Sequence, residues 1–185
     1  MSVQPGDTIA IAGAGPVGLA ALLTARFYSP AAIFRIDPDD NRLHVAKTFG
    51  ATALFNSADG TAIQQDRELT HGEGVDVALE AVGLPATFDI CQSVIGAGGR
   101  FAHIGVHGKP VLPHLEKLSD RNATLTTRLV DTVSTPILIK SVLSGALNPC
   151  QFMTHRFAMD DILRVRNCRC GSYRTPIRTR IPATP

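Results

Sequence analysis

Short apolar runs alternate with stretches of helical periodicity along most of the chain. Six apolar runs predict strands, over residues 8–12, 32–36, 53–55, 75–80, 100–104 and 125–127. The stretches between and after them predict helices, over residues 17–28, 38–49, 60–70, 86–94 and 135–144. Alternating strands and helices are typical of βαβ units, whose consecutive strands run parallel. The pattern therefore predicts a doubly wound α/β fold on a six-stranded parallel sheet, with ligands at the carboxyl ends of the strands.

Composition narrows the classes of partner. Of the 185 residues, 44% are hydrophobic and 18% are charged, a balance typical of a globular domain. The net charge is +2, and much of the positive charge lies after Leu163. The chain has no basic stripe with interleaved aromatic residues, so a nucleic-acid partner is not expected. The four cysteines form no C-x-x-C pair, which favours free thiols in a cytoplasmic protein.

Residues 8–25 carry no charge and could be mistaken for a membrane span. Three glycines and a proline would interrupt such a helix, and Asp7 stands where a signal peptide would carry basic residues. No membrane association is therefore expected.

The first predicted strand leads directly into a G-x-G-x-x-G run. Its candidate cofactor-binding residues are Gly13, Gly15, Pro16, Val17 and Gly18. Between a strand and a helix, this spacing is typical of a dinucleotide site: the first glycine makes a tight turn, the second leaves room for the pyrophosphate, and the third lets helix and strand pack closely. The helix amino terminus would direct unpaired N–H groups at the phosphates. The alternative is a turn that serves packing alone.

Asp37 ends the second predicted strand, 19 residues after Gly18. A dinucleotide site places a carboxylate there for the ribose hydroxyls, and that negative charge disfavours a 2′-phosphate, so NAD is expected rather than NADP. Asp37 followed by Pro38 is also a good helix N-cap, a compatible second reading.

A series of further motifs carries a family resemblance. Residues 13–23, Asp37, residues 42–52, 74–83 (GVDVALEAVG), 98–100 (GGR) and 105–108 (GVHG) together resemble the coenzyme domain of zinc-dependent, medium-chain alcohol dehydrogenases. The resemblance covers residues 3–163, and flavoprotein Rossmann domains share only its first glycine run. It implies hydride transfer between an alcohol and NAD, with this chain as the NAD-binding half.

The resemblance also implies roles for individual residues. Val17 and Gly18 would lie against the pyrophosphate, and Asp37 and Arg42 would flank the adenosine ribose. The remaining assignments are Val82 near the adenine, Ile104, Gly105 and Val106 along the nicotinamide, and backbone groups near Thr127 and Arg128 at the carboxamide. Arg42 is equally well explained as a solvated helix arginine. Relatives pair coenzyme domains at the sheet edge near Leu125, which implies a homodimer.

Two departures from the family stand out. The family's zinc ligands come from a domain that precedes the coenzyme domain, and a first strand at Thr8 leaves no room for that domain. The histidines do not replace these ligands, because His103 and His107 straddle a strand end and a loop and form no cluster with metal-ligand spacing. No metal site and no catalytic residue are therefore expected, and a small alcohol would bind only if a catalytic domain were supplied. We expect an NAD-binding domain over residues 1–148 and an aberrant segment over 149–185. The end of this segment, from Arg164, lacks helical and strand periodicity and is interpreted as a frame-shifted reading, with a basic tail that binds nucleic acid as the alternative.

Three functions are consistent with these observations. The chain could be a dehydrogenase coenzyme domain that acts with a separately encoded catalytic part. It could be a non-catalytic NAD-binding module, such as a sensor or regulatory subunit. It could also be a truncated gene product without activity.

Overall fold

The computed structural model describes residues 3–129, 132–153 and 158–161, and contacts divide the chain into two compact units, Met1–Thr135 and Pro136–Pro185. The first unit holds a six-stranded sheet in the order β3-β2-β1-β4-β5-β6, with every described pair parallel. This is the strand order of a Rossmann fold, so the predicted doubly wound sheet is confirmed. The strands are β1 (Thr8–Ala12), β2 (Ala32–Asp37), β3 (Ala53–Asn56), β4 (Val75–Glu80), β5 (Ile95–His103) and β6 (Thr124–Thr127).

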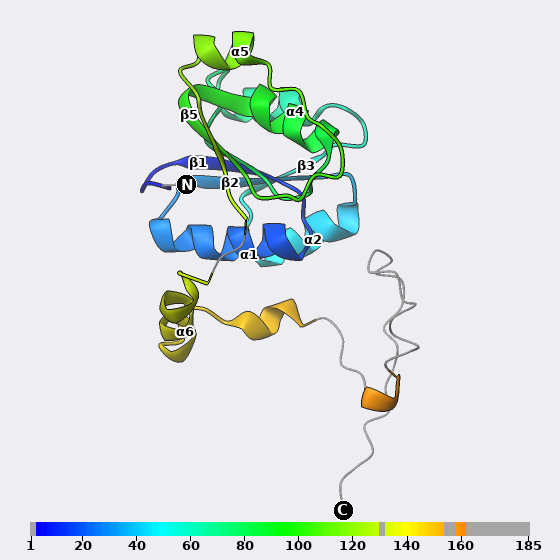
Figure 1. Cartoon of the computed structure of the whole chain (residues 1–185), viewed down its shortest axis with the longest axis vertical. Coiled ribbons are helices and arrows are strands. Elements are labelled where there is room, and N and C mark those ends of the chain that lie inside the picture. The colour runs from blue at the N-terminus through cyan, green and yellow to red at the C-terminus, as the bar shows by residue number, and fades with distance from the viewer. Residues whose placement is uncertain (1–2, 130–131, 154–157, 162–185) are drawn as a thin grey trace, which may run out of the picture. The chain divides into compact units, whose positions relative to one another are not determined.

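Helices cover both faces of this sheet. They are α1 (Pro16–Ala25, continued by a 3-10 turn, Arg26–Tyr28), α2 (Asp40–Thr48), α3 (Ala62–Leu69), α4 (Pro85–Val94) and α5 (Leu115–Asp120). Figure 1 shows α1 and α2 on one face and α4 on the other, the arrangement that right-handed crossovers produce on either side of the first strand. The second unit contains most of α6 (Thr135–Leu143) and two 3-10 turns, Pro149–Phe152 and Met159–Asp161.

The core follows the alternation of side chains along the strands. On the α4 face, the ring centroids of Phe34 and Phe55 lie 5.2 Å apart, and those of Phe88 and Phe101 lie 4.8 Å apart. The side chains facing α1 include Ile9 and Ile11 of β1, both buried. Burial on both faces explains why β1 reads as a continuous apolar run from Ile9 to Ala12.

Three local expectations are wrong. The glycine-rich residues 96–99 suggest a turn that leads into the strand predicted over residues 100–104, but they belong to β5, which starts at Ile95 and has a register irregularity against β4. Helix α5 was not expected, because its six residues show too little periodicity to be recognised. The N-cap of α2 is Asp39, not Asp37: the Asp39 carboxylate accepts hydrogen bonds from the N–H groups of Asn41 and Arg42.

Among the described residues, no helix is long and apolar enough to cross a membrane. The predicted domain boundary after residue 148 stays a prediction. The expectation for the segment from Arg164 to Pro185 lies outside the described residues.

Candidate dinucleotide-binding site

The turn between β1 and α1 requires two of its glycines for its shape. Gly13 adopts φ +99°, a conformation that side chains disfavour, and a Cβ there would collide with Val82. A Cβ on Gly18 would collide with the carbonyl oxygen of Gly13, so the helix can approach the turn only because position 18 is glycine. These two glycines therefore have the tight-turn and packing roles that the spacing predicts.

Gly15 differs from its neighbours because a Cβ at this position would meet no atom within 4 Å. Its backbone is extended, a conformation open to any residue, and it caps α1 without a side-chain hydrogen bond. The folded chain alone thus gives no reason for glycine here. A ligand that approaches the backbone closely would supply one.

The amino terminus of α1 points free donors at this open space. The N–H of Leu19 makes the first intrahelical bond, to the Gly15 carbonyl at 2.9 Å. The N–H groups of Val17 and Gly18 come before it, so they have no acceptor within the helix. Unpaired donors together with the helix dipole form an anion site, which suits a pyrophosphate.

Asp37, at the end of β2, is tied to the glycine turn. Its Oδ2 accepts from the Ala14 N–H at 2.7 Å, and its Oδ1 accepts from the Asp39 N–H at 3.0 Å. The residue is buried, with 3% exposure. A carboxylate has about four lone-pair sites, so these two bonds leave acceptors for two ribose hydroxyls.

Arg35 lies beneath the same turn and was missed by sequence analysis. Its side chain is fully buried on β2, and its guanidinium donates to the Gly18 carbonyl at 3.0 Å and to the Gly13 carbonyl. Burial lowers the pKa of Arg35 to about 10, while the nearby Asp37 carboxylate raises it, so the group stays charged at neutral pH. A basic residue inside an otherwise apolar strand was the signal that could have found it.

The guanidinium of Arg42 has a partner at the N-cap of its own helix, Asp39. Its Nε lies 3.9 Å from Oδ2 of Asp39, and both side chains are about one-third exposed. This geometry fits a solvated helix arginine. A ribose contact by Arg42 stays a prediction.

The other predicted residues gather at the carboxyl edge of the sheet. Val82 follows β4, and its N–H donates to Oε1 of Glu80 at 2.8 Å. Ile104 and Gly105 follow β5, and their N–H groups donate to the backbone carbonyl oxygen of Glu80 at 3.0 and 3.2 Å. Val106 is 76% exposed. Thr127 ends β6, and the Arg128 N–H donates to the His103 carbonyl at 3.2 Å. The fold thus brings these residues, far apart in sequence, to the edge where the glycine turn lies.

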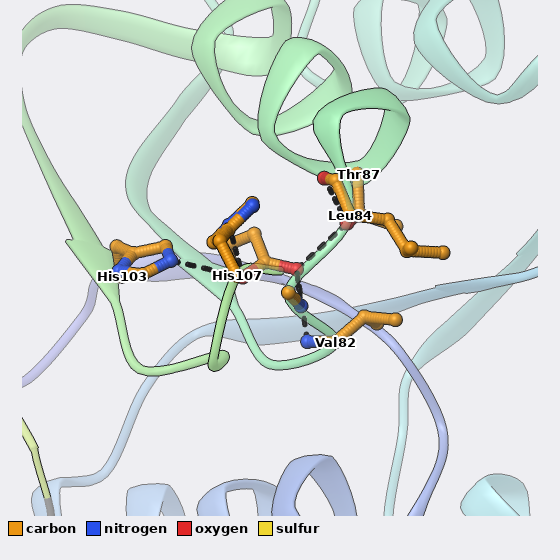
Figure 2. A network of polar contacts seen from close by, with 7 residues as sticks. Val82, Leu84, Thr87, His103 and His107 are labelled. Carbon is orange, nitrogen blue, oxygen red and sulfur yellow. Dashed lines mark hydrogen bonds and ion pairs between the residues drawn. The ribbon is translucent and has the colours of Figure 1, made fainter. Parts of the chain in front are cut away.

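Beside this edge, the structure assembles a polar cluster that spacing did not predict (Figure 2). Register pairs Glu80 of β4 with His103 of β5, and the loop after β5 brings His107 to the same carboxylate. Oε2 of Glu80 lies 3.6 Å from Nε2 of His103 and 3.5 Å from Nε2 of His107. Burial lowers the pKa of His103, as does His107, whereas Glu80 raises it.

A glycine turn on a free helix terminus, with a carboxylate at the end of the next strand, defines a dinucleotide-binding Rossmann domain. Residues 16–139 match the family model described as zinc-binding dehydrogenase. The chain belongs to this family and comprises its NAD(P)-binding half.

Curated and solved relatives agree with this assignment. An alcohol dehydrogenase from Cupriavidus necator is 31% identical over 169 residues, which are 88% of this chain and 45% of that protein. The structure of zinc dependent alcohol dehydrogenase 2 from Streptococcus pneumonia, in its apo form, is 54% identical with a TM-score of 0.84, over 88% of this chain and 47% of that one. Alcohol dehydrogenase TADH from Thermus sp. ATN1 is 30% identical with a TM-score of 0.82, and the match covers 88% of this chain and 48% of that one. The chain spans about half the length of the relatives it matches.

Proposed function

We propose that this chain binds NAD(H) in preference to NADP(H), as the coenzyme domain of an alcohol-oxidising dehydrogenase. The observation that carries the proposal is the Asp37 carboxylate, held by the Ala14 N–H at 2.7 Å beside the open space at Gly15. The pyrophosphate would bind at the amino terminus of α1, and the adenosine ribose would bind at Asp37.

Charge supports the choice of NAD. A 2′-phosphate beside Asp37 would place like charges close together, at a cost on the order of 4 kcal/mol per charge pair at about 4 Å with an effective dielectric near 20. One structure of similar fold, a zinc-binding dehydrogenase from Sinorhizobium meliloti, holds NADP, but at 22% identity it shares the fold alone. The preference therefore rests on Asp37.

In the reaction we propose, this chain orients the cofactor. NAD, when bound, would supply the hydride acceptor for oxidation of the alcohol carbon. Ile104, Gly105 and Val106 would support one face of the nicotinamide ring, and backbone groups near Thr127 and Arg128 would fix its amide. The family's zinc would act as a Lewis acid on the alcohol oxygen. This chain alone should bind the cofactor without oxidising alcohols.

Calorimetry of the whole chain with NADH and NADPH tests the proposal. We expect NADH to bind at least tenfold more tightly than NADPH, and simple alcohols with NAD to give no NADH above background. If neither cofactor bound at millimolar concentration, the result would contradict a coenzyme domain. Equal or tighter NADPH binding would contradict the assignment of Asp37.

We also propose that the protein is cytoplasmic, because Cys91 and Cys150 in the described part of the chain are free thiols.

We further propose that two copies of the chain pair through β6. All four residues of β6 are exposed, Leu125 to 40%, and among the described strands β6 pairs only with β5. An open edge strand can extend a sheet into a second copy. In light scattering the chain should be a dimer, and Leu125→Lys should shift it to a monomer; a monomeric parent would contradict the pairing.

A further inference from the structure

Glu80 has one satisfied and one unsatisfied carboxylate oxygen. Its Oε1 accepts three hydrogen bonds, from the N–H of Val82 at 2.8 Å, the N–H of Gly83 at 2.9 Å and the hydroxyl of Thr87 at 2.7 Å. Its Oε2 has no hydrogen-bond partner among the described residues, although Glu80 is fully buried. A buried carboxylate oxygen without a donor is costly, so this atom needs a positive partner.

Two histidine rings face this oxygen. Nε2 of His103 and of His107 lie 3.6 Å and 3.5 Å from it, too far for a normal hydrogen bond. Both Nε2 atoms are buried and without a hydrogen-bond partner in the described part of the chain, as is Nδ1 of His107. The side chains of His103 and His107 are only 17% and 11% exposed.

Backbone geometry holds the three groups together. Glu80 and His103 are register partners on adjacent strands, so their side chains lie on the same face of the sheet. The loops after β4 and β5 then cross so closely that a Cβ on Gly105 would collide with Glu80 and Gly83. The crossing brings His107 over the carboxylate, and Phe88 of α4 stands 6.2 Å, between ring centroids, from each imidazole.

We propose that Glu80, His103 and His107 form a binding site for a divalent transition-metal ion, with Zn(II) as the matching probe. Imidazole and carboxylate are the ligands this class of ion selects. Zinc–ligand bonds of about 2.0–2.2 Å place tetrahedral ligands about 3.3–3.5 Å apart, close to the two N···O separations observed here. The three ligand atoms lie within 4.8 Å of one another.

The surroundings suit a metal site. The three donors on Oε1 fix the orientation of the Glu80 carboxylate and leave Oε2 for the ion, as supporting hydrogen bonds do around metal ligands. Three protein ligands would leave a fourth position for water or another ligand atom. The ion would fasten the loop after β4 to the loop after β5. The proposal goes beyond cofactor binding and reverses the sequence-based expectation of no metal site.

Zn(II) titration of the whole chain tests the site. Cys150, Cys168 and Cys170 are first replaced by serine, because thiolates also bind zinc. In this background, calorimetry should show one Zn(II) per chain, and Co(II) should give visible d–d absorption typical of a low-coordinate site. Each of His103→Asn, His107→Asn and Glu80→Gln should weaken Zn(II) binding at least tenfold, and His103→Asn/His107→Asn should abolish it.

Matched controls are available on the same chain. His44 on α2 and His71 after α3 are exposed, and His71 has φ +53°, which asparagine tolerates. His44→Asn and His71→Asn should leave Zn(II) affinity unchanged. Circular dichroism checks that each variant folds, and NADH affinity is measured separately, so failure of the metal site and failure of cofactor binding are distinguishable. No Zn(II) binding by the folded parent, or stoichiometric binding by the double variant, would overturn the proposal.

Discussion

The carboxylate of Asp37 accepts the backbone N–H of Ala14 at 2.7 Å, which links the end of β2 to the glycine turn that follows β1. The bond holds the two predicted halves of the dinucleotide site in a fixed relationship before any ligand binds. A preformed site loses less conformational entropy on binding, which favours affinity.

Gly15 and Gly18 should respond differently to alanine. Gly15→Ala adds a methyl to open space and should fold with unchanged Tm, yet weaken NADH binding at least tenfold, because the methyl occupies the position of the pyrophosphate. Gly18→Ala forces a methyl against the Gly13 carbonyl and should destabilise the fold by about 1–3 kcal/mol. Thermal melts and NADH titration measure both. Normal NADH affinity in Gly15→Ala would contradict the pyrophosphate position.

Arg35 should strengthen binding of both cofactors equally. Its buried cation bonds the carbonyls of Gly13 and Gly18, directly beneath the turn, so it attracts the pyrophosphate that NAD and NADP share. Arg35→Met should weaken NADH and NADPH binding by similar factors, about five- to tenfold, and Arg35→Lys should retain most of the affinity. Calorimetry with each cofactor gives the factors. A large change in the ratio of the two affinities would show that Arg35 acts on the ribose end instead.

Asp66 on α3 should make stability depend on pH. Both carboxylate oxygens are buried without a hydrogen-bond partner in the described part of the chain, and burial raises the pKa of Asp66 to about 7, with Arg67 opposing. The folded state therefore holds the proton more tightly than the unfolded chain. The contribution of Asp66 to the free energy of unfolding is therefore greatest below about pH 4 and declines as the pH rises to about 7.

Asp66→Asn removes this dependence. The variant should be more stable than the parent at pH 8, by on the order of 2 kcal/mol, and the difference should shrink towards pH 4. Urea unfolding at several pH values measures it, with Glu68→Gln, an exposed acid on the same helix, as the control. A difference that is constant between pH 4 and pH 8 would show that ionisation of Asp66 is not the cause.

Much of the fold was predictable because its signals are local. Strand–helix alternation and the glycine run placed every strand of the sheet in the right order of elements. The GAGPVG motif with Asp37 predicts the dinucleotide site that we propose. Helix α5 and the start of β5 were not predictable, since a six-residue helix and glycines within a strand carry weak local signals. The N-cap of α2 was misplaced because Asp37 and Asp39 both fit the local pattern.

The features that sequence reasoning missed depend on tertiary contacts. The whole of α4 and most of β5 lie between Glu80 and His103 in the sequence, and only the β4–β5 register makes the two residues neighbours. The sequence predicts Arg35 only as part of a strand, because its burial under Gly13 and Gly18 depends on how α1 packs on β2. Spacing along the chain does not encode such proximity.

The most direct test of the central claim is the ratio of NADH to NADPH affinity in Asp37→Asn. Asparagine keeps an oxygen for the Ala14 N–H, so the turn should survive while the negative charge is removed. Asp39→Asn is the matched control, because asparagine also caps helices well. We predict that Asp37→Asn lowers NADH affinity and reduces the preference for NADH over NADPH at least tenfold, while Asp39→Asn leaves it unchanged. An unchanged preference in Asp37→Asn would contradict the account.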